Sequence, residues 1–287
     1  MVLLLALFAA IAIAREVIGM WALVQVSCLV WLLAAPAAIP TIVAHRGASH
    51  DAPENTLAAF RLGFARGADA AECDVHLTAD GRIVALHDAD TARTAGGRKR
   101  RVAESSLAAL RALDVGGWKA ERFAGERIPL LSEILDALPA GKRLLIEVKC
   151  GPEILERLQR VLAASGKRDQ VVIMSFSLAV VRGVEQRLAA VPAYWLRDAA
   201  DDGRGGQRPF ALELVQRTRR AGLDGLGLHH GGVRPELVAA AHRAGLQVYA
   251  WTVDDAAEAR RLQRAGVDGL ITNRPGWLRR QLASEQR

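Results

Sequence analysis

Short apolar runs recur along residues 41–275 and alternate with segments whose apolar positions repeat every three or four residues. The short runs have the length of buried strands, whereas the longer segments have the spacing of amphipathic helices. Several of these segments end in a glycine just before the next apolar run, as at Gly166, Gly222 and Gly266, which is typical of helix ends. The pattern predicts parallel strand–helix units. The predicted strands are residues 41–44, 71–75, 144–148, 171–175, 193–196, 225–228, 247–251 and 269–272.

Eight such units indicate an α/β protein in which the strands close into a (β/α)8 barrel, the TIM-barrel fold, rather than an open sheet. We expect residues 41–287 to form this single domain and residues 1–40 to form an apolar leader that includes a helix. An excursion at about 89–141 interrupts the rhythm before the third barrel strand. Insertions of this length in barrels are usually functional or lid-like.

A hairpin is predicted after the second strand, where the sequence reads HLTADGRIVALHD. Asp80-Gly81 is a strong signal for a two-residue turn between antiparallel strands. A turn centred there pairs residues whose numbers sum to 161 and sets Asp74 opposite His87. The predicted hairpin therefore returns His87 to the level of the second strand.

The leader consists of two apolar stretches, 2–14 and 17–40, separated by Arg15 and Glu16. The second stretch is long enough to cross a bilayer, which takes about 20 apolar residues. We expect it to be a membrane anchor that holds an extracytoplasmic catalytic domain. The alternative is a signal peptide, since Ala35-Pro36-Ala37 resembles a cleavage site, and cleavage would release a soluble exported enzyme.

Composition narrows the choice of partners. The net charge of +7 suits a phosphate-bearing ligand or an anionic membrane surface. No basic helix with interleaved aromatic residues and no DNA-binding motif is present, so a nucleic-acid partner is not expected. The three cysteines, Cys28, Cys73 and Cys150, match no zinc or redox spacing, and their odd number argues against a disulfide framework.

Charged residues interrupt two of the predicted strands at alternate positions. Glu72 and Asp74 share one face of the second strand, and Glu147 and Lys149 share one face of the third. Barrel active sites lie at the carboxyl ends of the strands, so these faces should meet in the barrel mouth. Three buried carboxylates need a compensating cation, and oxygen ligands suit Mg²⁺ or Ca²⁺. An ion-pair network with Lys149 and Arg46 is the alternative.

The neighbouring residues fit phosphoryl transfer. Arg46 and Lys149 can bind phosphate oxygens, the first through a bidentate fork and the second as a point charge. His45 and His87 are histidines at or beside strand ends, and their imidazoles titrate near neutral pH as a general acid and base must.

Several motifs in this order resemble the glycerophosphodiester phosphodiesterases, which are related to phosphatidylinositol phospholipase C-like phosphodiesterases. The motifs are HRGASHDAPENTLAAF (45–60), ECDVHLTADGRIVALHD (72–88), LLIEVK (144–149), WTVD (251–254) and DGLITNRP (268–275). The resemblance covers almost the whole chain after the leader. It implies metal-dependent hydrolysis of a glycerophosphodiester to glycerol 3-phosphate and an alcohol.

The resemblance also implies a role for each matching residue. His45 and His87 would be the acid–base pair, with metal contact by His87 left open, and Glu54 would support the site or bind the metal. The metal ligands would be Glu72, Asp74 and Glu147, and the substrate would be bound by Arg46, Lys149 and Trp251.

Two polar elements depart from the family pattern. His229-His230 is expected to cap the end of the sixth strand rather than touch substrate, and Asp254 is expected to cap the helix that follows it in the sequence.

Three alternative functions stay open. A membrane anchor could present lysophospholipids to the site, as in a lysophospholipase D-type enzyme. An inactive phosphate- or lipid-binding module is a further alternative. A phospholipase C-like or sphingomyelinase D-like barrel fits less well, because the PENT and DGLITN elements favour the first family.

Overall fold

Eight parallel strands pair side by side and close into a barrel. The structure, a computed structural model, describes residues 39–284. Within this part of the chain, β1 pairs with β2 on one side and with β9 on the other, which completes the ring. All eight predicted strands are confirmed, four with the predicted bounds and four with one or more extra residues at an end. They are β1 (Thr41–Ala44), β2 (Ala70–Leu77), β4 (Arg143–Val148), β5 (Val171–Ser175), β6 (Ala193–Arg197), β7 (Gly225–His229), β8 (Gln247–Trp251) and β9 (Gly269–Thr272).

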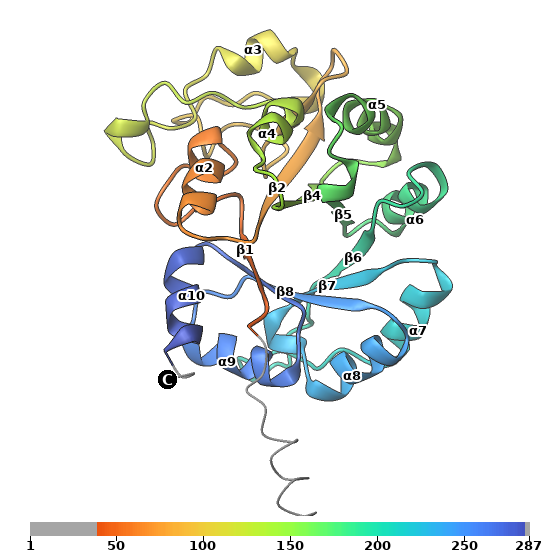
Figure 1. Ribbon diagram of the computed structural model, residues 1–287. Coiled ribbons are helices and arrows are strands. Elements are labelled where there is room, and N and C mark those ends of the chain that lie inside the picture. Colours follow the sequence, from red (N-terminus) through yellow and green to blue (C-terminus); the bar gives the residue numbers. More distant parts are fainter. Residues whose placement is uncertain (1–38, 285–287) are drawn as a thin grey trace, which may run out of the picture. The chain divides into compact units, whose positions relative to one another are not determined.

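Helices surround the barrel (Figure 1). Each turns its apolar stripe inward, as α5 does with Leu155, Leu158 and Leu162. The buried faces of the helices and the outward side chains of the strands form the larger part of the core. The surrounding helices are α2 (Leu57–Ala65), α4 (Leu131–Ala137), α5 (Leu155–Ser165), α6 (Leu178–Arg187), α7 (Glu213–Arg220), α8 (Pro235–Arg243), α9 (Ala256–Ala265) and α10 (Pro275–Ala283).

A second, smaller core fills the inside of the barrel. Strand alternation divides β2 between the two cores: Cys73 and Val75 pack outward with the helix-facing cluster, whereas Ala70 packs inward. Glu72 and Asp74, at even positions like Ala70, therefore point into the barrel. The inner apolar cluster consists of Val43, Ala70, Leu145, Val172, Met174, Tyr194, Leu196, Tyr249 and Ile271, with Trp251 against it.

The hairpin after β2 is present, but its predicted register is wrong by one residue. Val75 pairs with Ala85 in β3 (Ile83–Ala85), so the residue numbers of each pair sum to 160. The loop has three residues rather than two, because Gly81 takes a left-handed conformation with φ of 70° at its third position. Asp74 consequently lies opposite Leu86, whose backbone N–H donates to the Asp74 carbonyl at 3.1 Å, and His87 lies one residue further along.

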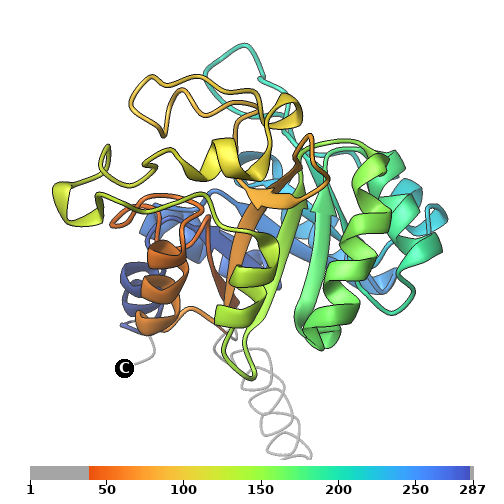
Figure 2. The ribbon, with the colours of Figure 1, turned by 90° about the horizontal axis from the view of Figure 1, so that it is seen from above.

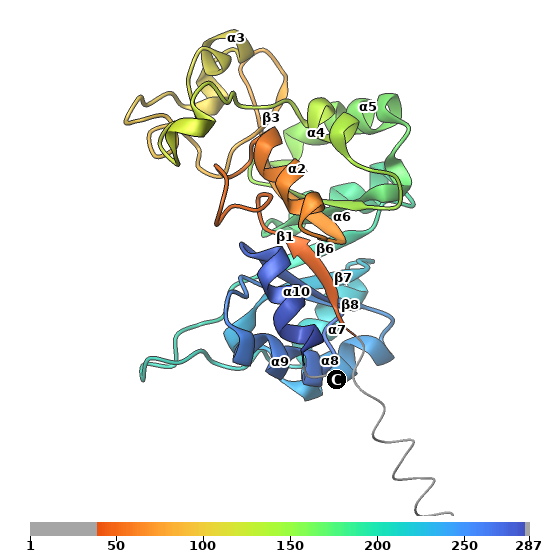
Figure 3. The same ribbon diagram turned by 60° about the vertical axis from the view of Figure 1, so that its left-hand side comes forward.

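The excursion before β4 has two parts. Residues 89–130 include the short helix α3 (Leu107–Arg111) and pack with Val84 and Leu86 of the hairpin around a small core that contains Leu110, Val115 and Ile128. Figure 2 shows this part beyond the same end of the strands as the loop between β6 and α7, and Figure 3 shows it on the α2 and α4 side of the barrel. The remainder, α4, contacts α2 and α5 and belongs to the ring of helices.

The predicted membrane anchor or signal peptide lies outside the described residues, apart from Ile39 and Pro40. Between residues 39 and 284, none of the helices combines the length and apolar character that crossing a membrane would need.

Candidate active site

Three carboxylates converge in the barrel mouth. Glu72 and Asp74 come from β2 and Glu147 comes from the adjacent β4, where it is paired in register with Asp74. One oxygen from each side chain can be chosen so that all three atoms lie within 4.8 Å of one another. Glu72 and Asp74 are buried almost completely, with 2% and 1% of their surface exposed. Strand alternation thus brings the predicted acidic residues together on the inner face.

Arg46 and Lys149 lie against this acidic cluster. The Arg46 backbone N–H donates to Glu72 Oε2 at 2.9 Å, and Arg46 Nε lies 3.2 Å from Asp74 Oδ2. Lys149 Nζ donates to Glu147 Oε1 at 2.7 Å and lies 3.6 Å from Asp74 Oδ1. Two cations therefore face three carboxylates, so the ion-pair network expected as an alternative is present but leaves the cluster one positive charge short.

The buried oxygens show where further positive charge fits. Glu72 Oε1 and Asp74 Oδ1 are inaccessible to solvent and have no hydrogen-bond partner. Burial, together with repulsion from Asp74 and Glu147, raises the pKa of Glu72 well above its usual value. Burial and the nearby Asp74 raise the pKa of Glu147 to about 7. An all-carboxylate set with unpaired oxygens is the kind of site that Mg²⁺ or Ca²⁺ occupies.

The loop after β1 holds one of these carboxylates through Asn55, a residue not singled out from the sequence. Asn55 Nδ2 donates to Asp74 Oδ2 at 2.8 Å, and the Asp74 backbone N–H donates to Asn55 Oδ1 at 3.1 Å. Arg46 and Asn55 have φ of 54° and 57°, a conformation that few non-glycine residues adopt and that asparagine tolerates best. An asparagine beside Glu54 in the PENT element was the available signal.

His45 is held by a residue from the far end of the chain. An amide oxygen only accepts, so His45 Nδ1 donates to Asn273 Oδ1 at 2.7 Å. Asn273 is itself fixed by Asp254, whose Oδ1 accepts from the Asn273 backbone N–H at 2.8 Å. Burial and the neighbouring Arg46 lower the pKa of His45 to about 4. The remaining ring nitrogen, Nε2, lies 4.0 Å from Glu72 Oε2.

The expected role of Asp254 as a helix cap is wrong. The N-cap of α9 is Asp255, which accepts from the Glu258 backbone N–H at 2.8 Å. Asp254 turns toward β9 instead and accepts from Thr272 Oγ1 as well as from Asn273. Either aspartate of the pair could cap the helix by sequence, and the nearby Asn273 accounts for the difference.

His87 is oriented in a similar way by a local partner. Its Nδ1 donates to Asp88 Oδ1 at 2.7 Å, and its backbone carbonyl lies 3.2 Å from His76 Nε2, which donates to it. Glu54 lies apart from the acidic cluster and accepts from Arg46 Nη1 at 3.0 Å. These contacts favour a supporting place for Glu54 and identify Asp88 as a further residue of the site.

A cavity of about 220 Å³ connects these groups. Its apolar wall includes Trp251, whose ring meets Phe176 edge-on with the centroids 5.6 Å apart. His229 meets the same indole edge-on at 5.4 Å, and its Nδ1 accepts from the Gly231 backbone N–H at 3.3 Å, so it caps the short 3-10 turn His230–Gly232 that follows β7. The cavity is lined by His45, Arg46, Glu72, His87, Glu147, Lys149, Met174, Phe176, Leu196, Trp251, Thr252 and Ile271.

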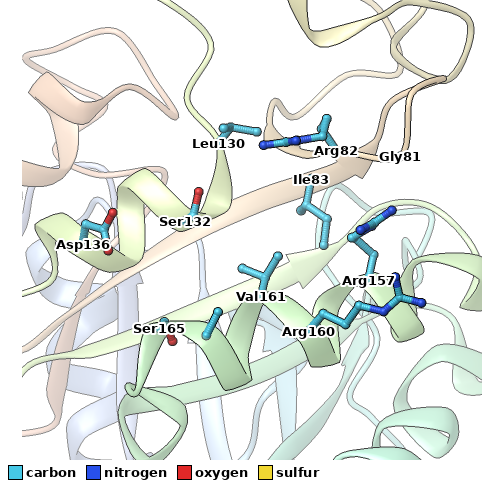
Figure 4. A pocket seen from close by; sticks show the side chains of 11 residues that line it. Gly81, Arg82, Ile83, Leu130, Ser132, Asp136, Arg157, Arg160, Val161 and Ser165 are labelled. Atoms are coloured by element: carbon cyan, nitrogen blue, oxygen red, sulfur yellow. The ribbon is translucent and has the colours of Figure 1, made fainter.

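A larger cavity, of about 340 Å³, lies outside the barrel between the hairpin loop, α4 and α5 (Figure 4). Its polar side chains are mainly those of Arg82, Arg157 and Arg160, and Asp136 is its single carboxylate. It contains no histidine and no group of acidic residues. The chemistry that the sequence predicts is therefore gathered in the barrel mouth.

Comparison with known proteins gives a consistent result. Residues 45–277 match the Glycerophosphoryl diester phosphodiesterase family. A glycerophosphodiester phosphodiesterase of Caldanaerobacter subterraneus is 34% identical over 241 residues, which cover 82% of this chain and 94% of that protein.

Two solved structures illustrate the likeness of the fold. An Oleispira antarctica phosphodiesterase in complex with the product sn-glycerol-3-phosphate is 27% identical with a TM-score of 0.77, over 85% of this chain and 97% of that one. A glycerophosphodiester phosphodiesterase from Agrobacterium tumefaciens is 26% identical with a TM-score of 0.70, over 83% and 98%.

Because the three carboxylates lie close together, we expect the stability of the folded protein to depend on pH in an unusual way. Glu147 has a folded-state pKa of about 7, above its ordinary value of 4.5. The folded protein therefore keeps this proton over a range in which the unfolded chain loses it, and stability falls as pH rises through that range. The difference corresponds to at most about 3 kcal/mol.

Denaturant unfolding of chelator-treated protein at pH 5 and pH 8, compared with Glu147→Gln, would measure the effect. We expect the variant to lose less stability than the unmodified chain between the two pH values. Equal losses of stability in both proteins would show that the pKa of Glu147 is not raised in the folded state.

Proposed function

This chain belongs to the glycerophosphoryl diester phosphodiesterase family, and we propose that His45 and His87 catalyse its reaction beside a divalent cation. The family's reaction is hydrolysis of a glycerophosphodiester to glycerol 3-phosphate and an alcohol, and the chain is a glycerophosphodiester phosphodiesterase. The observation that carries the proposal is that two histidines, each held through Nδ1, line one cavity with three carboxylates.

Glu72, Asp74 and Glu147 are the residues that would hold the cation. The buried oxygens of Glu72 and Asp74 that lack a hydrogen-bond partner, and the raised pKa values of Glu72 and Glu147, support this assignment. When bound, Mg²⁺ or Ca²⁺ supplies positive charge beside the phosphodiester and the developing transition state. Arg46 and Lys149 line the same cavity and would hold the phosphate oxygens.

The histidines would move the protons. Because each Nδ1–H is engaged by an acceptor, each ring can present Nε2 to a reacting group. One Nε2 would take the proton of the attacking hydroxyl, which is either water or the substrate's own glycerol 2-hydroxyl. Attack by the 2-hydroxyl would form a cyclic glycerol phosphate as the bond from phosphorus to the alcohol breaks, and water would then open that ring to give glycerol 3-phosphate. The other would give a proton to the oxygen of the departing alcohol. Asn273 and Asp88 fix the direction in which each ring points.

The shape of the cavity bears on the substrate. A cavity of about 220 Å³ suits a small diester such as glycerophosphocholine, and Trp251 and Phe176 provide an apolar wall for the glycerol carbons. We therefore propose small glycerophosphodiesters as the preferred substrates and lysophospholipids as the second candidate.

We propose that residues 17–40 anchor the protein in a membrane and that the catalytic domain lies outside the cytoplasm. This proposal rests on the apolar character of that stretch. Fractionation of cells that express the full chain tests it, because an anchored protein stays with the membranes and a cleaved one does not.

Removing either catalytic imidazole should abolish most of the turnover. We expect His45→Ala and His87→Ala each to lower kcat by about 10²- to 10⁴-fold, the usual contribution of a general acid or base. Release of glycerol 3-phosphate from glycerophosphocholine, coupled to its oxidation, measures the rate. His242→Ala is the matched control, because His242 pairs with Asp268 and does not line the cavity. Near-normal turnover of both active-site variants would rule out the assignment.

A panel of diesters assayed with and without chelator tests the metal and the substrate together. We expect EDTA to abolish release of glycerol 3-phosphate and added Mg²⁺ or Ca²⁺ to restore it, because three carboxylates lose their counter-charge. Glycerophosphocholine should be hydrolysed faster than lysophosphatidylcholine. Undiminished activity in EDTA would contradict the proposed metal site, and the reverse order of substrates would favour the lysophospholipase D-type function.

A further inference from the structure

We propose that Arg93, which belongs to the excursion between β3 and α4, is a positioning residue that holds His87 in its catalytic orientation through Asp88. The proposal rests on the role of His87 in the proposed function. Arg93 does not line the cavity, so it would act through its contacts rather than on the substrate.

The Arg93 guanidinium connects two loops of the site. Its Nη1 and Nη2 donate to Glu54 Oε2 and Oε1 at 2.7 and 2.8 Å, which makes a bidentate pair. Its Nε donates to Asp88 Oδ2 at 2.7 Å. Glu54 follows β1 and Asp88 follows β3, so one side chain from the excursion joins the two segments that carry the catalytic histidines.

Asp88 is the link to the catalytic ring. One of its oxygens accepts from Arg93 and the other accepts from His87 Nδ1 at 2.7 Å. The Asp88 side chain is 34% exposed, and apart from Arg93 its carboxylate has His87 as its only ion-pair partner within residues 39–284. Without Arg93, the carboxylate would be free to rotate and the imidazole would lose its fixed direction.

Glu54 extends the same chain of contacts to the phosphate side. Its Oε1 accepts from Arg93 and also from Arg46 Nη1 at 3.0 Å.

Arg93 also keeps Asp88 ionised. Its hydrogen bond is the largest of the causes that lower the pKa of Asp88 to about 2, so the Asp88 carboxylate stays charged at neutral pH. Arg93 thus orders His87 and Arg46 together through two ionised acceptors.

The backbone that presents Arg93 is itself well held. Thr91, two residues earlier, is fully buried, and its Oγ1 accepts from the Arg100 backbone N–H at 3.1 Å. The Thr91 N–H donates to the Arg100 carbonyl at 3.1 Å, and the Ala95 N–H donates to the Thr91 carbonyl at 2.9 Å. These hydrogen bonds hold the backbone around Arg93 in place. The excursion would therefore contribute to the reaction by positioning Arg93.

Arg93→Ala tests the inference, with Arg111→Ala as the matched control. Arg111 belongs to the same excursion and also pairs with a carboxylate, Glu133 of α4, at 2.6 Å, but neither residue lines the cavity. We expect Arg93→Ala to lower kcat by about 10- to 100-fold, as misorientation of a catalytic group does. KM should change by less than about threefold, because Arg93 does not touch the substrate and Arg46 keeps its own contacts with Glu54 and Asp74. Arg111→Ala should keep the kcat of the unmodified chain.

Two further measurements separate positioning from general stability. A lysine at position 93 cannot donate to Glu54 and Asp88 with the geometry of a guanidinium. The kcat of Arg93→Lys should therefore lie between that of Arg93→Ala and that of the unmodified chain. Guanidinium ion at low, non-denaturing concentration should raise the kcat of Arg93→Ala and leave that of Arg111→Ala unchanged. The proposal is overturned by a normal kcat in Arg93→Ala, by an equal loss in Arg111→Ala, or by a loss that guanidinium fails to reverse in a folded variant.

Parallel assay of His87→Ala distinguishes this inference from the proposed function. If His87→Ala keeps normal turnover, the role of His87 fails and the positioning role fails with it. If His87→Ala is inactive while Arg93→Ala is normal, the proposed function stands and only the role of Arg93 is wrong.

Discussion

Mutual repulsion among Glu72, Asp74 and Glu147 is the constraint around which the barrel mouth is organised. Three carboxylates taken out of water are stable together only when positive charge and hydrogen-bond donors surround them. Arg46 and Lys149 supply part of that charge, and Asn55 brackets Asp74 with two hydrogen bonds. Glu72 Oε1 and Asp74 Oδ1, which have no hydrogen-bond partner, are where the proposed divalent cation would add positive charge.

Each proposed catalytic histidine is held by an acceptor on Nδ1, but the two acceptors differ. His45 donates to an amide oxygen of Asn273, whereas His87 donates to the carboxylate of Asp88. The two rings therefore have unlike surroundings in one cavity, which is what a pair that must act as acid and base requires.

The excursion after β3 is more than a loop on the surface of a barrel. It packs around a small apolar core shared with the hairpin, and through Arg93 it reaches Glu54, which contacts Arg46, and Asp88, which contacts His87. Binding and catalytic residues of barrels commonly lie on loops that a rigid scaffold positions. Here the long connection is tied to the mouth by charge-assisted hydrogen bonds, so its sequence is constrained by the site as well as by its own packing.

The sequence by itself determined the eight strands and the inward face of Glu72, Asp74 and Glu147, because both follow from local periodicity. The hairpin was also visible, but its register was not, since TADGR allows a loop of either two or three residues. Only the tertiary structure decided which distant residues hold His45 and Glu54. Asn273 reaches His45 across 228 residues because β9 pairs with β1, and Arg93 reaches Glu54 across 39 because the excursion folds back over the mouth. Contacts of this kind depend on where individual loops and side chains lie once the barrel has closed, which no local pattern encodes.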